Sequence, residues 1–193
     1  GGALSEEPGI DGQKILASDA AYQAGLTTPA ALDGKSFGMT TAGSSFHYMG
    51  SKIAAAEGVT PSFKPLQKVG AIIGALKTGQ IDAWSIVPHI AKPLAASGSV
   101  HIIGDVADYL PNYQVTTVFT STGNAADERD MTTGFIAGFS KGVADYNATM
   151  IDKADGAQGV TEMVNLIHKY VYTDRPIDKA GPSIINGTMR LNE

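Results

Sequence analysis

The chain has 193 residues, enough for one domain or two small lobes with a buried core. Hydrophobic residues make up 43% of it and charged residues 17%, proportions that fit neither intrinsic disorder nor a coiled coil. A net charge of −5 argues against a general attraction to nucleic acid or anionic membranes, and the absence of cysteine excludes disulfides, iron–sulfur clusters, thiolate zinc sites and cysteine nucleophiles.

Short β-rich runs alternate with helical patterns over the first two thirds of the chain, which is typical of βαβ units and a mostly parallel sheet covered by helices. The predicted strands are residues 14–18, 35–41, 62–66, 81–87, 100–104 and 113–121. Helices are expected after the second, third and fourth strands. They should end at Gly58, Gly79 and Gly98, because glycine readily adopts the left-handed conformation that terminates a helix.

The pattern becomes purely helical after Ser121. A long helix is predicted from Asn124, as its N-cap, to about residue 152, and a second helix over residues 160–172 before Arg175-Pro176. The sequence therefore predicts an α/β protein in which one compact lobe is inserted into another. The expected lobes are residues 1–18 with 116–193 (lobe I) and residues 19–115 (lobe II).

The clearest local signal lies at residues 40–48, where a predicted strand passes through Gly43 into a helix start. Backbone N–H groups at a helix N-terminus lack intrahelical partners, and the helix dipole favours a carboxylate, sulfonate or phosphate there. Ser44 or Ser45 would add a hydroxyl donor, although an ordinary N-cap is the alternative explanation. A serine hydrolase is not indicated, because neither serine has glycine two residues before and two after it.

Motifs for nucleotides, metals and membranes are missing. Residues 34–36 (GKS) resemble the end of a phosphate loop, but Pro29 occupies the position of the required earlier glycine. The four histidines show no metal-ligand spacing, and the longest apolar run is about eight residues against the roughly 20 that span a bilayer. Residues 1–12 lack a secretory signal pattern. We therefore predict no catalytic residue, no cofactor and no metal.

Aromatic and histidine side chains supply further ligand candidates. Trp84, the only tryptophan, lies on the predicted strand 81–87, where it would serve either the core or a ligand platform. His89 follows Pro88 at a helix start, where it would face the same cleft as His47 or serve only the surface. Tyr48 lies on the first turn of the helix that contains His47.

Three segments in order resemble the type II periplasmic solute-binding proteins, most closely the nitrate, sulfonate, taurine and thiamine-precursor (NMT1/THI5-like) group of ABC importers. Residues 31–38 (ALDGKSFG) resemble the opening of the second lobe in that family. Residues 43–47 (GSSFH) are similar to its ligand loop, and residues 76–83 (LKTGQIDA) to its "L-x-x-G-x-(apolar)-D-A" segment. The resemblance covers roughly residues 13–150.

The resemblance implies a two-lobed clamshell of mostly parallel sheets with flanking helices. It also implies that a small organic anion or an aromatic or heterocyclic solute is bound by hinge closure, without chemistry, and delivered to an ABC importer permease. Residues 14–18 and 115–120 would be the two interlobe crossings. The location would be periplasmic, or extracytoplasmic with a lipid anchor, and the membrane would be contacted only through the transporter. The ligand-binding residues that follow are Ser44, Ser45, His47, Tyr48, Trp84, Ser85, Pro88, His89, Tyr113 and Thr116.

The family begins with a βαβ portion of the first lobe that has no counterpart upstream of Ala3. We therefore expect an incomplete first lobe with a large exposed apolar patch, which further residues or a partner would cover. Two alternatives remain: a ligand-sensing domain of the same fold, and an enzyme of the thiamine-pyrimidine branch, whose cysteine-rich motif is absent here. The only arginines, Arg129, Arg175 and Arg190, argue weakly against a guanidinium clamp in lobe II.

Overall fold

The computed structural model describes residues 4–192, and the chain divides into two compact units. Glu7–Asn112 form one, the sheet unit, and Gly1–Glu6 with Tyr113–Glu193 form the other, the helical unit. The first boundary therefore lies near residue 6, not at residue 18 as expected from the sequence. The reason is that β1 (Lys14–Ser18) is hydrogen-bonded on both sides to strands of the sheet unit.

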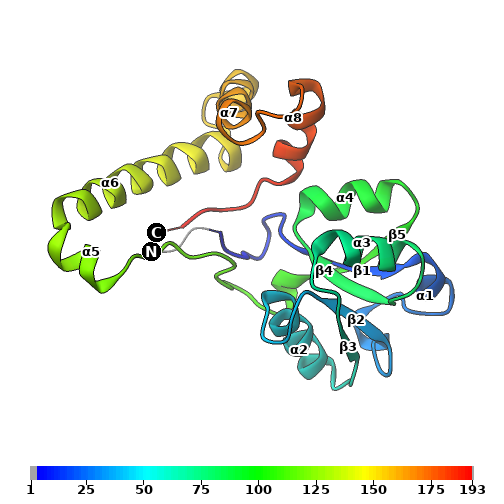
Figure 1. Ribbon diagram of the computed structural model, residues 1–193. Helices are drawn as coiled ribbons and strands as arrows, with labels where there is room; N and C mark the ends of the chain where they lie inside the picture. The colour runs from blue at the N-terminus through cyan, green and yellow to red at the C-terminus, as the bar shows by residue number, and fades with distance from the viewer. Residues whose placement is uncertain (1–3, 193) are drawn as a thin grey trace. The chain divides into compact units, whose positions relative to one another are not determined.

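The sheet unit contains a five-stranded sheet of order β3-β2-β4-β1-β5 (Figure 1). The other strands are β2 (Ser36–Met39), β3 (Ser62–Pro65), β4 (Ala83–Ile86) and β5 (Val100–Asp105). β2 is parallel to β3 and β4, and β1 is antiparallel to both β4 and β5. The sheet is therefore mixed, but β1 alone of the five strands runs in the opposite direction. This agrees with the predicted α/β class and its mostly parallel sheet.

Helices cover both faces of this sheet. They are α1 (Asp19–Gln23), α2 (Ser45–Glu57), α3 (Val69–Lys77) and α4 (Pro88–Ala96), with short 3-10 turns at η1 (Pro29–Ala31) and η2 (Val106–Asp108). Phe37 of β2 contacts α2 at Gly50, where an added Cβ would lie 2.9 Å from its ring. The next residue, Gly38, faces α3, since a Cβ there would lie 2.9 Å from Ile72. Alternation along the strand thus places α2 and α3 on opposite faces.

The predicted helix ends are confirmed in this unit. Gly58 is the C-cap of α2 with φ of 68°, and Gly79 and Gly98, just beyond α3 and α4, have φ of 71° and 73°. These are left-handed conformations that cost little only for glycine. The largest fully buried side chains of the unit form its core: Trp84, Phe37, Ile15, Leu16, Leu26, Leu32, Met49, Ile53, Ile72 and Leu76.

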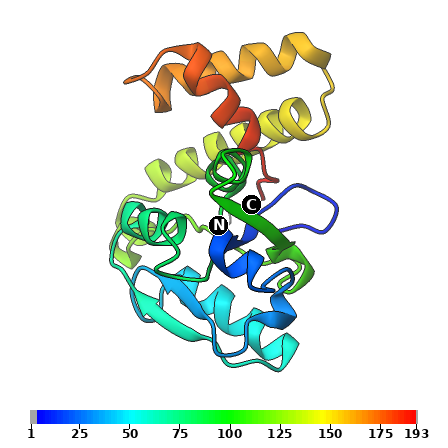
Figure 2. The ribbon, with the colours of Figure 1, turned by 90° about the vertical axis from the view of Figure 1, so that its right-hand side faces the viewer.

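In the helical unit, the described residues from α5 onward, 122–192, form helices and no β-strand (Figures 1 and 2). The elements are α5 (Thr122–Asp127), α6 (Arg129–Tyr146), the π-helical η3 (Asn147–Ile151), α7 (Gly156–Val171) and α8 (Ile177–Asn186). A small core of Met150, Val164, Ala180 and Ile184 joins η3, α7 and α8.

Two predictions for this unit are wrong, and one helix was missed. The predicted strand 113–121 is no strand, because within residues 4–192 it has no neighbouring strand and forms isolated bridges such as Ser5–Gln114. The predicted N-cap Asn124 lies inside α5, whose cap is Ser121: its hydroxyl accepts from the Asn124 N–H at 3.0 Å. The missed helix is α8, which contains Pro182, a residue that disfavours helix interiors.

Candidate functional site

The carboxyl ends of three parallel strands meet at one edge of the sheet unit. α2, α3 and α4 follow β2, β3 and β4, so all three helices begin at this edge, which we call the carboxyl edge. β1 runs the opposite way, and its first residue Lys14 pairs with Asp105, the last residue of β5. The incoming and outgoing segments of the unit therefore reach the same edge. Ligands of open α/β sheets commonly bind at such an edge.

The start of α2 is held by two local hydrogen bonds. The Ser44 hydroxyl accepts from the His47 N–H at 3.4 Å, and the Gly43 N–H donates to His47 Nδ1 at 3.0 Å. Gly43 has φ of 80°, a conformation suited to glycine. Ser44 is therefore the N-cap of α2, which was the alternative to a ligand-binding role for this serine. Within residues 4–192, the N–H groups of Ser45 and Phe46 have no hydrogen-bond partner, and Ser45 is exposed.

His47 is a fixed, half-buried ring at this helix start. Since Nδ1 accepts the Gly43 N–H, the neutral ring carries its proton on Nε2, which leaves Nε2–H as a donor. The ring packs edge-to-face against Phe63 with centroids 4.7 Å apart. The neighbouring Tyr48 is 45% exposed, and the Lys52 ammonium lies 5.8 Å from its ring centroid. The structure therefore brings Ser44, Ser45, His47 and Tyr48 together on one helix turn.

Gln67, between β3 and α3, is a candidate site residue at the carboxyl edge, and the sequence analysis did not identify it. It has φ of 64°, a left-handed conformation that is uncommon outside glycine and costs about 1–2 kcal/mol. Its N–H donates to the Thr40 carbonyl at 2.8 Å, so it lies beside the tail of β2, and it is exposed. Glutamine gives no local signal for such a conformation, and the sequence therefore offered no way to find it.

Trp84, Ser85 and Pro88 are buried in the sheet unit. The Trp84 ring lies 5.3 Å from that of Phe46, and its Nε1 is buried without a hydrogen-bond partner. The Ser85 hydroxyl lies 3.9 Å from Met49 Sδ, a weak contact inside the core. In this structure, packing accounts for these three side chains. His89 is half-buried, and this burial lowers its pKa, which favours the neutral ring.

Tyr113 and Thr116 belong to the helical unit, where both contact the N-terminal segment. The Tyr113 carbonyl accepts from the Glu6 N–H at 2.9 Å, and the Thr116 hydroxyl accepts from the Leu4 N–H at 2.9 Å. These contacts are internal to that unit. The predicted ligand set is therefore divided between the start of α2, strand β4 and the start of α4 in the sheet unit, and the segment 113–116 of the helical unit.

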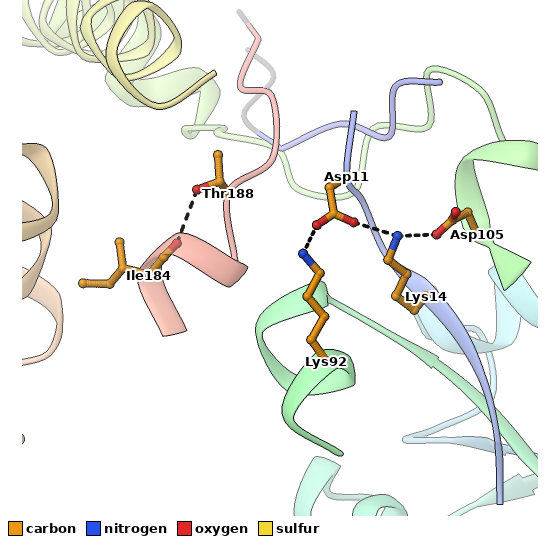
Figure 3. Close-up of polar contacts among 6 residues, drawn as sticks. All are labelled: Asp11, Lys14, Lys92, Asp105, Ile184 and Thr188. Carbon is orange, nitrogen blue, oxygen red and sulfur yellow. Dashed lines mark hydrogen bonds and ion pairs between the residues drawn. The ribbon is translucent and has the colours of Figure 1, made fainter. Parts of the chain in front are cut away.

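A network of four charged side chains joins the segments that meet at the carboxyl edge (Figure 3). Lys14 contacts Asp11, at 2.7 Å, and Asp105, and Asp11 also contacts Lys92 of α4. Burial opposes the charged forms, but the hydrogen bonds prevail: the pKa of Lys14 is raised, and hydrogen bonds from Lys14 and Lys92 lower the pKa of Asp11. Lys14 thus ties the incoming segment to the end of β5.

Within residues 4–192, no three histidine, aspartate or glutamate side chains are grouped so that they would hold a metal ion. Nor does any helix of the described chain have the length and apolar character needed to cross a membrane.

Solved structures define the class to which this fold belongs. The alkanesulfonate-binding protein SsuA from Xanthomonas axonopodis pv. citri bound to MOPS matches with a TM-score of 0.63 and 17% identity, over 98% of this chain and 60% of that one. A ligand-binding component of an ABC-type import system from Staphylococcus aureus with zinc bound matches with a TM-score of 0.63 and 11% identity, over 95% of this chain and 58% of that one. The periplasmic aliphatic sulphonate binding protein SsuA from Escherichia coli matches with a TM-score of 0.60 and 17% identity, over 99% of this chain and 57% of that one.

The fold is therefore that of the periplasmic binding proteins, and this chain spans about three fifths of the length of these structures. No curated protein sequence matches the chain. A family model described as NMT1/THI5 like matches residues 17–150, more than half of the chain. The chain belongs to the NMT1/THI5-like family, as the three sequence segments predicted.

Proposed function

We propose that this protein is the extracytoplasmic solute-binding component of an ABC importer and binds a small organic anion without chemical conversion. The observation that carries the proposal is the start of α2 at the carboxyl edge, where the Ser45 and Phe46 N–H groups have no partner among the described residues 4–192. Membership of the NMT1/THI5-like family and the solved binding proteins with the same fold support it.

The donors at this turn suit a singly charged group. The first turn of α2 carries the two N–H groups that have no partner within residues 4–192, the Ser45 hydroxyl and His47 Nε2–H, and the helix dipole adds partial positive charge. All three arginines lie in the helical unit, so the sheet unit offers no bidentate guanidinium for a dianion. A monoanionic sulfonate or carboxylate matches this set, and the exposed Tyr48 ring favours a solute with an aromatic or heterocyclic part.

Turnover is not part of the proposal, because the groups that would activate a nucleophile at this turn are occupied. The Ser44 hydroxyl accepts the His47 N–H, and the His47 Nδ1 lone pair accepts the Gly43 N–H. A serine nucleophile needs a histidine nitrogen that is free to accept its proton. With Nδ1 occupied by the Gly43 N–H, Nε2–H is the hydrogen-bond donor that His47 offers to the solute.

Two adjacent serines allow a matched test. Native mass spectrometry of the purified protein identifies any retained solute, and calorimetry with MOPS and with nicotinate supplies a sulfonate and a heteroaromatic carboxylate as probes. Ser45→Ala should weaken binding of the tighter probe about tenfold with unchanged thermal stability, since it removes one hydrogen bond to a charged group. Ser44→Ala should lower the stability by about 1 kcal/mol through loss of the cap. Equal affinities of Ser45→Ala and wild type, or no binding of either probe and no retained solute, would contradict the proposal.

A further inference from the structure

The connection between β3 and α3 contains a strained three-residue turn centred on Gln67. The Lys68 N–H donates to the Leu66 carbonyl at 2.7 Å, which closes the turn around a central φ of 64°. A three-residue turn with a positive central φ is the rare and strained form of the γ-turn. The strain belongs to Gln67 itself, because the Cβ of a left-handed residue lies too close to the following carbonyl oxygen.

Gln67 differs from every other left-handed residue described in the sheet unit. Those other positions hold glycine or asparagine, which adopt this conformation at lower cost than other residues. Glutamine has no such preference, and a glycine at this position would form the same turn without strain. The backbone therefore gives no reason for a glutamine here, and strained residues of this kind cluster at ligand-binding positions. The residues compared are Gly9, Gly25, Gly34, Gly43, Gly58, Gly79, Gly98 and Asn112.

The turn is fixed to the strand that leads into the proposed solute site. The Leu66 N–H donates to the Met39 carbonyl at 2.8 Å. The Gln67 N–H donates to the Thr40 carbonyl at 2.8 Å as well. Met39 is the last residue of β2, and Gly43 and the start of α2 follow within a few residues. The backbone of Gln67 is therefore held beside the loop that leads to the donors proposed for the anion.

Strand β3 connects Gln67 to His47 as well. The Phe63 ring of β3 packs edge-to-face against the His47 ring, with centroids 4.7 Å apart. β3 ends at Pro65, two residues before Gln67. The Gln67 side chain is exposed, and within residues 4–192 its amide group makes no hydrogen bond. This carboxamide is therefore available to a solute at the carboxyl edge.

The Gln67 side chain supplies a group that the first turn of α2 lacks. The Ser45 and Phe46 N–H groups and His47 Nε2–H are donors only, which suits the anionic end of a solute. The carboxamide oxygen of glutamine is an acceptor with two lone pairs. A site with such an acceptor discriminates against analogues that lack the matching donor, because the acceptor is then left unpaired.

We propose that Gln67 is a specificity-determining residue of the solute site, whose side-chain oxygen accepts a hydrogen bond from an N–H or O–H group of the solute. The inference rests on the proposed function and narrows the solute to an organic monoanion that carries such a donor. The strain is retained because glycine, which would relieve it, has no side chain to make this bond.

Calorimetry with para-aminobenzoate and para-toluate tests this role, because these aromatic monoanions differ only by an amino group in place of a methyl group of similar size. Wild type should bind para-aminobenzoate about tenfold more tightly. Gln67→Met keeps the length of the side chain and removes the acceptor, so it should abolish this preference. Gln80→Met changes an exposed glutamine beyond the C-terminal end of α3, and this matched control should keep the preference.

Thermal melts give a second readout. Gln67→Gly should raise Tm by about 2–4 °C and abolish the preference, because it relieves the strain and removes the amide. The inference is overturned by an unchanged or lower Tm of Gln67→Gly, by equal or undetectable binding of the two probes to wild type, or by a preference that survives in Gln67→Met.

The proposed function is tested separately in the same series. If wild type binds MOPS or nicotinate, or retains a solute, while any of these results is found, the role of Gln67 is refuted and the proposed function stands. If wild type binds none of the four compounds and retains no solute, both fail.

Discussion

Gly50 in α2 allows a sharp test of how this helix packs on the sheet. An ideal Cβ at Gly50 would lie 2.6 Å from Phe63 Cε1 and 2.9 Å from Phe37 Cε1. Carbon atoms normally approach to about 3.5–4.0 Å, so Gly50→Ala must displace two aromatic rings by about 1 Å. Overpacking of this size costs about 1–3 kcal/mol. The gain in helix propensity returns about 1 kcal/mol. We expect Gly50→Ala to destabilise the sheet unit by about 1 kcal/mol, and by no more than about 2 kcal/mol.

Gly74 in α3 is the matched control. It is also a helical glycine, but a Cβ there would meet nothing within 4 Å. Gly74→Ala should therefore stabilise the unit by about 0.5–1 kcal/mol. Urea unfolding followed by Trp84 fluorescence reports on this unit alone, because Trp84 is the only tryptophan and is fully buried there. A Gly50→Ala midpoint equal to or above that of wild type would refute the packing of α2 against Phe37 and Phe63.

Two further predictions concern the ends of the strands. The Asp82 carboxylate accepts from the Ser36 N–H and the Ser36 hydroxyl, both at 2.7 Å, at the edge of the sheet away from the start of α2. Asp82→Ala should therefore destabilise the sheet unit by about 2–3 kcal/mol and leave ligand affinity unchanged. A loss of affinity, measured by calorimetry on the fully folded variant, would contradict this. The lowered pKa of Asp11 means that the ion pairs with Lys14 and Lys92 stabilise the protein at neutral pH and are lost as pH falls below about 4. In thermal melts, the stability of Asp11→Asn should therefore fall less than that of wild type between pH 6 and pH 3. The difference should be less than about 1 kcal/mol, because Asp11 is partly exposed. Equal losses of stability in the two proteins would refute the role of these ion pairs.

Local signals in the sequence were sufficient to predict most helices and strands of the sheet unit. The ends of α2 and α4 follow from Gly58 and Gly98, whose left-handed conformations are a property of glycine itself. The position of β1 inside the sheet could not be predicted from local signals, because it depends on pairing with residues 66 to 91 positions away in sequence. The prediction of a strand over residues 113–121 was wrong for the same reason, because residues with high strand propensity form a strand only beside a neighbouring strand.

The candidate site was predicted only in part. Gly43 and the two serines marked the start of α2, but the sequence did not decide which serine is the cap, because that depends on the position of the His47 N–H. The burial of Trp84 is a tertiary property, which alternation along one strand does not determine. Gln67 was missed because its conformation is imposed by the pairing of residues 66 and 67 with the tail of β2.

The pairing of Lys14 with Asp105 has a consequence for modularity. The chain enters and leaves the sheet unit through two antiparallel neighbouring strands, so the two ends of Glu7–Asn112 lie side by side. A segment with adjacent ends and its own core can be excised, circularly permuted or grafted into a host loop with little strain. The sheet unit can therefore be transplanted to another scaffold together with its fold.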